Sequence, residues 1–208
     1  MHNQYHIDSE AALERIIGEP MEFVRAKVIP QLDTAMREFI QRAPLLFVAT
    51  TNSSGQVDVS PKGDPPGFVH IESDSCLLIP ERPGNRLTFG FRNILNNGEI
   101  GLIFLAPHQR EMLRVRGHAS LHCDPGHLEA MTVKGKPALM YTRVEISECF
   151  FHCGKAVIRS RLWQPNAWTG AEASLGARSF AETLGGGGEN ALEETEQLMD
   201  HSYKNELY

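Results

Sequence analysis

The sequence predicts a mainly β fold, an antiparallel barrel with helices at its periphery. The prediction rests on about six or seven short strand-like segments that follow one another closely and are mostly joined by hairpin turns. Regular crossover helices, which a parallel sheet requires, do not separate these segments. No G-x-G-x-x-G turn lies between a strand and a helix, so a dinucleotide-binding Rossmann fold is not expected.

The expected strands either alternate apolar and polar residues or are apolar throughout. Residues 57–60 alternate with period two after the turn residues 52–55, and the two segments together predict a β-hairpin. Residues 100–105 (IGLIFL) are apolar almost throughout, as in a strand that is buried on both faces. The complete set of expected strands is 45–51, 57–60, 68–71, 76–79, 100–105, 112–122 and 139–151.

Helices are expected before, between and after the strands. Ser9 is suited to cap a short helix over residues 9–18. Pro30 suits the first turn of a second helix, in which apolar residues recur at helical spacing. The other expected helices of this part of the chain span 86–97, 124–132 and 154–163.

The chain divides into three expected parts. Residues 1–43 form an N-terminal helical segment that packs on the barrel, and residues 44–170 form the barrel domain. Residues 171–208 form an extension in which the four glycines 185–188 act as a linker. After this linker, the acidic residues 191–207 form either a helix that packs on the barrel or on a partner, or a mobile tail.

The composition is that of an ordinary soluble globular protein and argues against several classes of function. Of 208 residues, 41% are hydrophobic and 22% are charged, and the net charge is −6 at pH 7. An acidic chain repels nucleic-acid backbones, so nucleic-acid binding is not expected. No apolar run approaches the ~20 residues that span a bilayer, and no signal-peptide pattern is present. A cytoplasmic protein that does not bind membranes is expected.

The four cysteines are expected to be reduced thiols, because a core of this size needs no disulfides. They are Cys76, Cys123, Cys149 and Cys153. Cys149, His152 and Cys153 suggest a metal site, but no second pair of ligands accompanies them, and structural zinc usually takes four. Small apolar thiols in the core are therefore the favoured interpretation.

Two basic loops follow predicted strand ends and carry the residue types that hold a phosphate. Arg and Lys donate charge-assisted hydrogen bonds to phosphate oxygens, and a helix N-terminus adds free backbone N–H groups. The alternative is that both loops are solvated turns whose charges serve solubility. The first loop holds Ser60, Lys62 and Gly63, and the second, just before an expected helix, holds Arg82, Gly84, Asn85 and Arg86.

The order of four segments resembles the FMN-binding split barrel of the pyridoxamine 5′-phosphate oxidase-like family. They are FIQRAPLLFVATTNSSGQVDVSPKGDPPGFV, LLIPERPGNRL, RNILNNGEIGLIFL and LRVRGHASL. The runs SPKGDPPGFV, LIPERPGNRL and FFHCGKAVIRSRLW are similar to those of a bacterial subgroup. The resemblance covers about residues 9–170. It implies an antiparallel split β-barrel with peripheral helices, a homodimer, and FMN bound at the dimer interface.

The resemblance also implies which residues contact FMN. The phosphate ligands would be Lys62, Arg82, Asn85 and Arg86, while Ser60 and Pro80 would lie close to the flavin at strand ends. This chain departs from the true oxidase, which has a tighter Ser-Arg-Lys run at the helix start, so the choice among the basic residues stays open. Arg161 and Trp163 fall where the oxidase binds its substrate and are expected to complete the cofactor site, but the oxidase's terminal Arg-Leu arrangement is not found.

His152 and Lys155 are the expected catalytic residues, on a pocket shared with the partner subunit. An imidazole titrates near neutral pH and can move a proton to or from reduced flavin or substrate. The alternative is that His152 is structural and Lys155 faces solvent. His118 and His122 lie on one expected strand face, which leaves haem ligation open.

The function expected from the resemblance is that of an FMN-dependent oxidoreductase that acts on a small molecule, with NADH or NADPH as a possible electron donor. Two alternatives remain. One is a flavin or haem carrier without turnover, and the other is a reductase that uses the deazaflavin F420 in place of FMN. The sequence does not identify the substrate.

Overall fold

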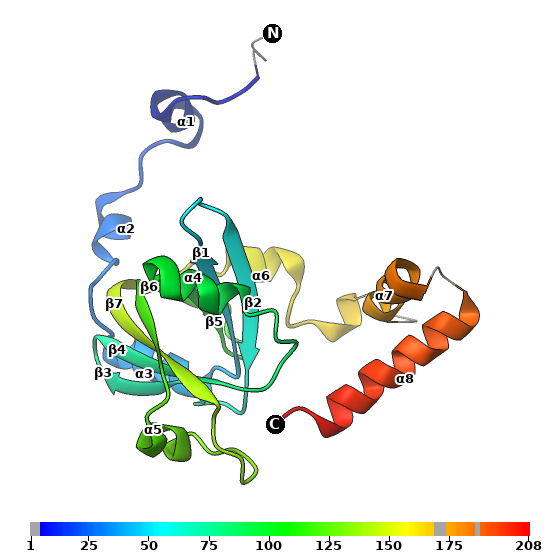
Figure 1. The fold of residues 1–208 in the computed structure, drawn as a ribbon. Coiled ribbons are helices and arrows are strands. Elements are labelled where there is room, and N and C mark those ends of the chain that lie inside the picture. Colours follow the sequence, from blue (N-terminus) through cyan, green and yellow to red (C-terminus); the bar gives the residue numbers. More distant parts are fainter. Residues whose placement is uncertain (1–4, 169–173, 186–187) are drawn as a thin grey trace.

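Seven antiparallel strands form a single sheet in the computed structural model, which describes residues 5–168, 174–185 and 188–208. The strand order is β2-β1-β5-β6-β7-β4-β3, so β2 and β3 are the edge strands, and the sheet curls into a split barrel (Figure 1). The predicted split barrel is thereby confirmed. The strands are β1 (Leu45–Thr51), β2 (Val57–Gly63), β3 (His70–Ser73), β4 (Cys76–Glu81), β5 (Glu99–Leu105), β6 (Met112–His122) and β7 (Met140–His152).

Helices lie around the barrel and at both ends of the chain. They are α1 (Glu10–Ile17), α2 (Glu22–Ala26), α3 (Thr34–Arg42), α4 (Phe89–Asn97), α5 (Pro125–Ala130), α6 (Lys155–Ser160), α7 (Leu175–Gly185) and α8 (Glu189–Asn205), with a short 3₁₀ turn over Pro165–Ala167. Among the described helices, none is both long and apolar enough to cross a bilayer.

The hydrophobic core fills the curled sheet and the space under α3 and α4. Leu46, Phe104 and Leu113 point inward from three strands, and Ile40 of α3 packs against them; all four are fully buried. Alternation along each strand places these residues inside, because successive side chains of a strand point to opposite faces. Burying such side chains contributes about 1.5–3 kcal/mol each. The core therefore fixes α3 and α4 to the sheet.

The observed elements match the predicted strands at β1 and β6 and differ at two helix starts. Asp33 caps α3 by accepting a 2.8 Å hydrogen bond from the Met36 N–H, so this helix begins at Thr34 and not near Pro30. The helix expected from residue 86 begins at Phe89, because Arg86 and Thr88 have positive φ angles of 60° and 57°. Left-handed residues do not continue an α-helix.

Strand β2 is longer than predicted and contains a proline. The sequence places a loop from Pro61 onward, whereas β2 continues to Gly63. Proline cannot donate to a sheet ladder, but β2 is an edge strand with a free side, where this is tolerated. The extension places Lys62 beside Glu81 of β4.

The N-terminal segment packs on the barrel through α3, whereas α1 and α2 bury none of their residues. Figure 1 shows α1 and α2 leading away from the barrel. Ile29, at the base of this arm, exchanges two backbone hydrogen bonds with Cys149 of β7, with N···O distances of 3.1 and 2.7 Å. The arm is thus anchored to the sheet at Ile29.

The extension after the barrel folds into α7 and α8, which pack against each other (Figure 1). Of the two alternatives for residues 191–207, the helix is formed, since α8 extends to Asn205. The predicted glycine linker lies partly outside the described residues, at 186–187. All four cysteines are free thiols, with Cys76 and Cys149 buried.

We predict that Gly117→Ala destabilises the barrel by about 1–3 kcal/mol, the usual cost of overpacking. Gly117 lies at a β-bulge where β6 and β7 shift register, and a Cβ there would collide with the backbone carbonyl oxygen of Glu145. Urea unfolding of the purified variant measures the effect. Gly101→Ala is the matched control, because its Cβ would meet only the Ala49 Cβ at 3.9 Å. Equal stabilities of the two variants would contradict the prediction.

Candidate functional site

A buried ion pair joins the edge strand β2 to the end of β4, beyond the residues of β4 that pair with β3. Lys62 of β2 lies 2.5 Å from a carboxylate oxygen of Glu81, the last residue of β4. Thr142 of β7 donates a 2.8 Å hydrogen bond to the other oxygen of Glu81. The Glu81 side chain is 4% exposed and that of Lys62 20%. Side chains thus connect the two strands where the backbone ladder does not.

Burial raises the pKa of the Glu81 carboxyl above its usual value, and the attraction and hydrogen bond of Lys62, with that of Thr142, offset only part of this effect. The Lys62 ammonium also lies 4.5 Å from the centre of the Phe91 ring of α4. A cation placed between a carboxylate and an aromatic face is held in one position. Lys62, which was expected as a phosphate ligand, is therefore already paired with Glu81.

Helix α4 covers this polar pair and adds a second buried contact. Asn93 donates a 3.0 Å hydrogen bond to the hydroxyl of Thr50, and both residues are buried. Ser60, Lys62 and Glu81 line a narrow space beneath the start of α4, so Ser60 is on the same side of β2 as Lys62. The neighbouring site residue, Pro80, is buried in β4 opposite Tyr141 of β7.

A second ion pair lies beside the first, just beyond the ends of the same two strands. Arg82 donates from Nε to Asp64 over 2.7 Å and from Nη2 to the carbonyl oxygen of Met131 over 2.8 Å. The side chains of Arg82 and Asp64 are 12% and 1% exposed. Arg82 Nη1 is buried and has no hydrogen-bond partner, and it is the only such side-chain atom in the described part of the chain. A buried donor without an acceptor is costly, so this nitrogen is suited to donate a hydrogen bond to a ligand oxygen.

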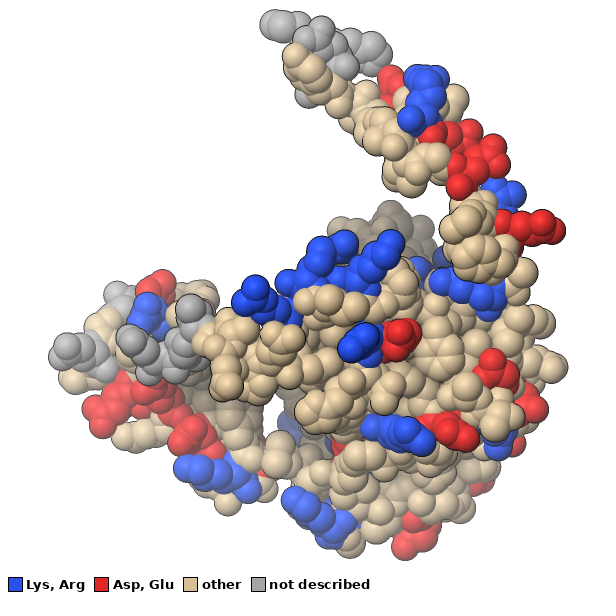
Figure 2. Space-filling model, turned by 180° about the vertical axis from the view of Figure 1, so that it is seen from behind, with Lys and Arg blue, Asp and Glu red and all other residues tan. Residues whose placement is uncertain are grey.

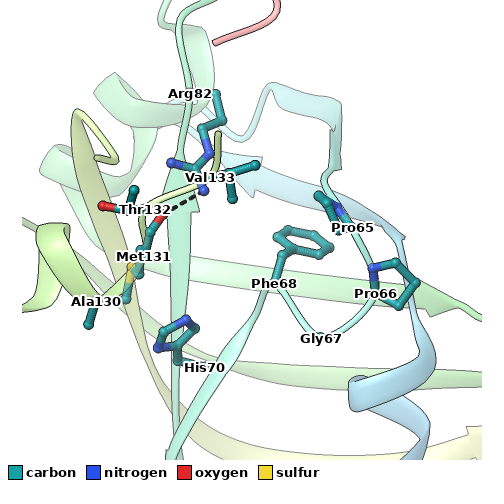
Figure 3. A pocket seen from close by; sticks show the side chains of 10 residues that line it. All are labelled: Pro65, Pro66, Gly67, Phe68, His70, Arg82, Ala130, Met131, Thr132 and Val133. Atoms are coloured by element: carbon teal, nitrogen blue, oxygen red, sulfur yellow. Dashed lines mark hydrogen bonds between the residues drawn. The ribbon is translucent and has the colours of Figure 1, made fainter. Parts of the chain in front are cut away.

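A cavity of about 180 Å³ adjoins Arg82 (Figure 3). Phe68 and His70 line it near β3, and Met131 and Val133 face them from the loop after α5. Burial, followed by the charges of His127 and Arg82, lowers the pKa of His70, which favours a neutral imidazole. Pockets for drug-sized ligands measure roughly 300–1,000 Å³. This cavity is too small to enclose a nucleotide within one chain.

The loop between β4 and α4 presents cationic and amide groups to solvent. Asn85 and Arg86 are exposed, and Arg86 makes no ion pair within the described residues. The Asn85 side chain accepts a 3.1 Å hydrogen bond from the Leu87 N–H, which holds the loop in a turn. Helix α4 begins without a side-chain cap. Its free N–H groups and the nearby guanidinium together form an arrangement that favours an anion.

The left-handed φ angles of Arg86 and Thr88 strain this loop. Non-glycine residues in this region cost of order 1 kcal/mol or more each, and such residues cluster at ligand sites. The strain keeps Arg86 outside α4. The strained segment is the loop of residues 82–88, between β4 and α4.

The remaining predicted residues lie at the other end of β7. His152 ends β7, whereas Met140 at its start pairs with Glu81. The thirteen residues of β7 extend over up to about 40 Å along the strand. Within one chain, the structure therefore does not bring His152 together with the 82–88 loop.

Three further predicted residues accompany His152 at that end. Lys155 begins α6 and is exposed, and Arg161 follows α6 with a φ of 53°. Trp163 donates a 2.6 Å hydrogen bond to the carbonyl oxygen of Gln109. Basic side chains gather on the rim of the barrel on the side from which the chain leads to α7 (Figure 2). This end of the molecule is thus also suited to an anionic ligand.

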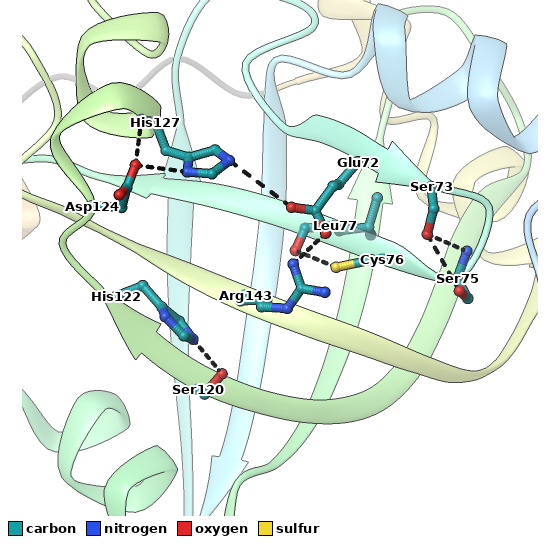
Figure 4. A network of polar contacts seen from close by, with 10 residues as sticks. All are labelled: Glu72, Ser73, Ser75, Cys76, Leu77, Ser120, His122, Asp124, His127 and Arg143. Atoms are coloured by element: carbon teal, nitrogen blue, oxygen red, sulfur yellow. Dashed lines mark hydrogen bonds and ion pairs between the residues drawn. The ribbon is translucent and has the colours of Figure 1, made fainter.

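A separate polar network covers the outer face of β3, β4 and β7 (Figure 4). Glu72 pairs with Arg143, which lowers the pKa of the Glu72 carboxyl, and His127 bonds to Asp124 over 3.0 Å. These groups are partly exposed, so screening makes their contribution small. His122 stacks on Tyr141 with ring centres 5.4 Å apart, and it bonds to Ser120. Among the described residues, no group of three or more His, Cys, Asp or Glu is placed to hold a metal.

Sequence reasoning missed Asp64, Glu81 and Thr142. Glu81 is the only charged residue of the otherwise apolar β4 (CLLIPE), and this pattern is the one local signal that it faces the barrel interior. Asp64 sits in a Pro/Gly-rich loop that gives no such signal. Both carboxylates acquire their role only from cations on another segment.

The fold and site define a class of protein, an antiparallel split barrel with a polar, helix-covered opening. Residues 32–153 match the model of the family described as pyridoxamine 5′-phosphate oxidase. The chain belongs to this family. No curated protein sequence matches the chain.

Several solved structures are similar to part of this chain at low sequence identity. HupZ of Group A Streptococcus is 19% identical, with 58% of this chain and 93% of that chain covered and a TM-score of 0.47. A protein of Lactobacillus delbrueckii described as a putative pyridoxamine 5′-phosphate oxidase is 20% identical, with 59% and 95% covered and a TM-score of 0.46. An FMN-binding protein of Syntrophomonas wolfei is 10% identical, with 55% and 86% covered and a TM-score of 0.41.

We predict that Lys62→Met destabilises the protein by about 3 kcal/mol at pH 8, because it leaves the buried Glu81 carboxylate unpaired. The loss is smaller at pH 5. A carboxyl whose folded pKa is raised contributes most to stability below its unfolded pKa, and this contribution is lost as the pH rises through the folded value. Removing Lys62 raises the pKa of Glu81 in the folded protein further. The pH range over which stability is lost therefore becomes wider.

Urea unfolding at pH 5 and pH 8 measures the difference. The double variant Lys62→Met, Glu81→Gln is the control, because it removes the charge that Lys62 neutralises and recovers most of the stability at pH 8. A loss for Lys62→Met that is the same at both pH values would refute this account of the pair.

Proposed function

We propose that this protein is a homodimeric FMN-binding flavoprotein that acts as an oxidoreductase on a small molecule. The observation that carries the proposal is the strained 82–88 loop, where the unpaired Arg86 adjoins the uncapped start of α4 in a chain of the pyridoxamine 5′-phosphate oxidase family. FMN ends in a phosphate monoester that carries nearly two negative charges. The loop offers the charge and the donors that such a group requires.

The residues present fit the phosphate of FMN. Arg86 and Asn85 are exposed and would hold it from the loop, with the N–H groups of α4 behind them. Arg82 retains one buried nitrogen without an acceptor, which a phosphate oxygen would satisfy. Lys62 is bonded to Glu81 and would support the loop from inside the barrel. Ser60 and Pro80 would lie closer to the flavin ring.

An apolar flank of the barrel favours a homodimer. Phe47 of β1 and Ile103 of β5 are paired neighbours on the outer face of the sheet, and each is more than a third exposed. Val59 of β2 is exposed beside them. A second copy would cover this flank with the same surface by two-fold symmetry.

The dimer also explains the separation of the two predicted groups of residues. His152, Lys155, Arg161 and Trp163 lie at the end of β7 that is remote from the 82–88 loop. In the proposed dimer, an antiparallel pairing of two barrels would place the His152 end of one subunit near the loop of the other. Each FMN would then lie between two chains, in agreement with a cavity that is too small for it within one.

FMN, when bound, supplies the hydride chemistry, and the chain supplies binding, orientation and proton transfer. Arg86 and Asn85 would fix the phosphate end, so that the ring is held in one register against the ends of the strands. His152 would donate or accept the proton that accompanies hydride transfer. Lys155 and Arg161 would attract an anionic substrate or NADPH.

The primary test is a titration of the purified protein with FMN, followed by addition of NADH or NADPH. We expect flavin absorbance, bleaching by one of the two donors, and recovery of absorbance with an electron acceptor. Bound flavin that no donor reduces would indicate a carrier. Preferential binding of F420 or haem in competition with FMN would identify that group as the cofactor. Protein that binds none of these would refute the proposal.

We predict that Arg86→Ala lowers FMN affinity about 10–150-fold, the effect of losing a hydrogen bond to a charged group worth ~1.5–3 kcal/mol. Fluorescence titration of FMN measures the dissociation constant. Arg15→Ala on α1 is the control, because this residue is exposed and α1 leads away from the barrel (Figure 1). An unchanged affinity in Arg86→Ala would remove Arg86 from the site.

We predict that His152→Gln slows turnover about 100-fold while FMN affinity stays within about twofold, since the loss of a general acid or base costs 10²–10⁴ in rate. Stopped-flow reduction and reoxidation of the bound flavin measure the rate, and a fluorescence titration measures the FMN affinity. A parallel fall in FMN affinity would assign His152 to binding in place of chemistry.

A further inference from the structure

Tyr208 docks on the barrel beside Arg82. Its hydroxyl donates a 3.0 Å hydrogen bond to Asp64, the carboxylate that also binds Arg82. Its ring lies 5.9 Å from the guanidinium carbon of Arg82 and 4.9 Å from the ammonium of Lys134. Lys136 donates to the backbone carbonyl oxygen of Tyr208 over 2.5 Å. One aromatic residue thus contacts four charged residues from three segments of the barrel.

These contacts enclose the Arg82 guanidinium. Asp64 accepts from Arg82 with one oxygen and from Tyr208 with the other. The ring of Tyr208 packs over Arg82, whose side chain is 12% exposed, while its Nη1 is left without an acceptor. The docked state therefore shields the Arg82 guanidinium and leaves its Nη1 without an acceptor. An anion that reached Nη1 would satisfy a donor that the docked state leaves unmet.

The docked segment is attached to the barrel at few points. Among the described residues, the two hydrogen bonds of Tyr208 are the only ones that join residues 174–208 to the barrel. Helices α7 and α8 pack on each other, and Leu198, Tyr203 and Leu207 remain more than half exposed. Figure 1 shows α8 standing beside the barrel and approaching it only near residue 208. Release of this one residue, side chain and backbone carbonyl oxygen together, would therefore free the segment from its hydrogen bonds to the barrel.

We propose that Tyr208 is a reversible latch, which shields Arg82 when docked and exposes its guanidinium to an anionic ligand when released. The ligand is a phosphate monoester, and its identification as FMN rests on the function proposed above. The latch makes the occupancy of the cofactor site depend on the position of α8. A phosphate bound at Arg82 and a docked Tyr208 exclude one another.

Chemical labelling of arginine tests the latch without any cofactor. The full-length protein and the variants Tyr208→Ala and Tyr208→Phe are treated with phenylglyoxal, and labelling of each arginine is followed by peptide mass spectrometry. Arg82 should label at least about tenfold faster in Tyr208→Ala than in the unmodified chain, since the variant loses a hydrogen bond to a charged group. Tyr208→Phe keeps the ring and should give an intermediate rate. The exposed Arg86 is the internal standard.

Tyr203→Ala is the matched control, because Tyr203 is an exposed tyrosine of α8. It should leave Arg82 as protected as in the unmodified chain. Equal labelling of Arg82 in the unmodified chain and in Tyr208→Ala would overturn the latch, and so would unmasking by Tyr203→Ala. Circular dichroism of each variant checks that the barrel is intact.

Binding of FMN to the same variants separates the latch from the proposed cofactor. The association rate should rise about tenfold or more in Tyr208→Ala, because the closed fraction is removed. If FMN binds all variants at the same rate although Arg82 is unmasked, the latch does not control the site and the inference fails. If no variant binds FMN while Arg82 is still unmasked by Tyr208→Ala, the latch stands and the proposed function fails.

Discussion

Two ion pairs across the split of the barrel are the constraint on which the rest of this structure depends. Lys62 meets Glu81, and Asp64 meets Arg82, each cation and carboxylate contributed by the opposite strand or loop. A closed barrel would satisfy these strand ends with backbone hydrogen bonds, which carry no net charge. Here charged side chains replace the ladder, and burial ties the geometry of the opening to the protonation of Glu81.

This mode of closure determines where a ligand can bind. The ion pairs hold the ends of β2 and β4 together, while α4 covers the polar interior through Phe91 and Asn93. The loop that leads into α4 is left strained and exposed, with Arg86 directed out of the core. Lys62 thus serves structure, whereas Arg86 and the one unpartnered nitrogen of Arg82 are left for a ligand. A family resemblance alone does not separate these two roles.

The length of β7 gives the second constraint. Because β7 has thirteen residues, its end beside Glu81 and its end at His152 lie too far apart to form one small-molecule site within a chain. Two copies related by a two-fold axis would solve this problem and would also cover the apolar flank of β1, β2 and β5. The segment that ends with Tyr208 adds a further level, because it docks on the same Asp64–Arg82 pair that forms part of the opening.

Much of the fold follows from local pattern. An apolar, β-rich run followed by turn residues located β1, the predicted long strand at 112–122 matches β6, and a combination of segments identified the split barrel. The predicted start of α3 near Pro30 and the predicted end of β2 before Pro61 were wrong. A capping carboxylate and an edge position decided them, and neither is visible in periodicity.

The sequence by itself determined the strand pattern, the family and the basic loop around Arg86, because these depend on residues that are neighbours along the chain. Only the tertiary structure decided which cations are already paired with a carboxylate. Lys62 and Arg82 are neutralised by Glu81 and Asp64, which lie about 18 or 19 positions away in sequence and become neighbours only when the sheet curls. The strength of a charge as a ligand depends on what else it touches, and folding sets those contacts.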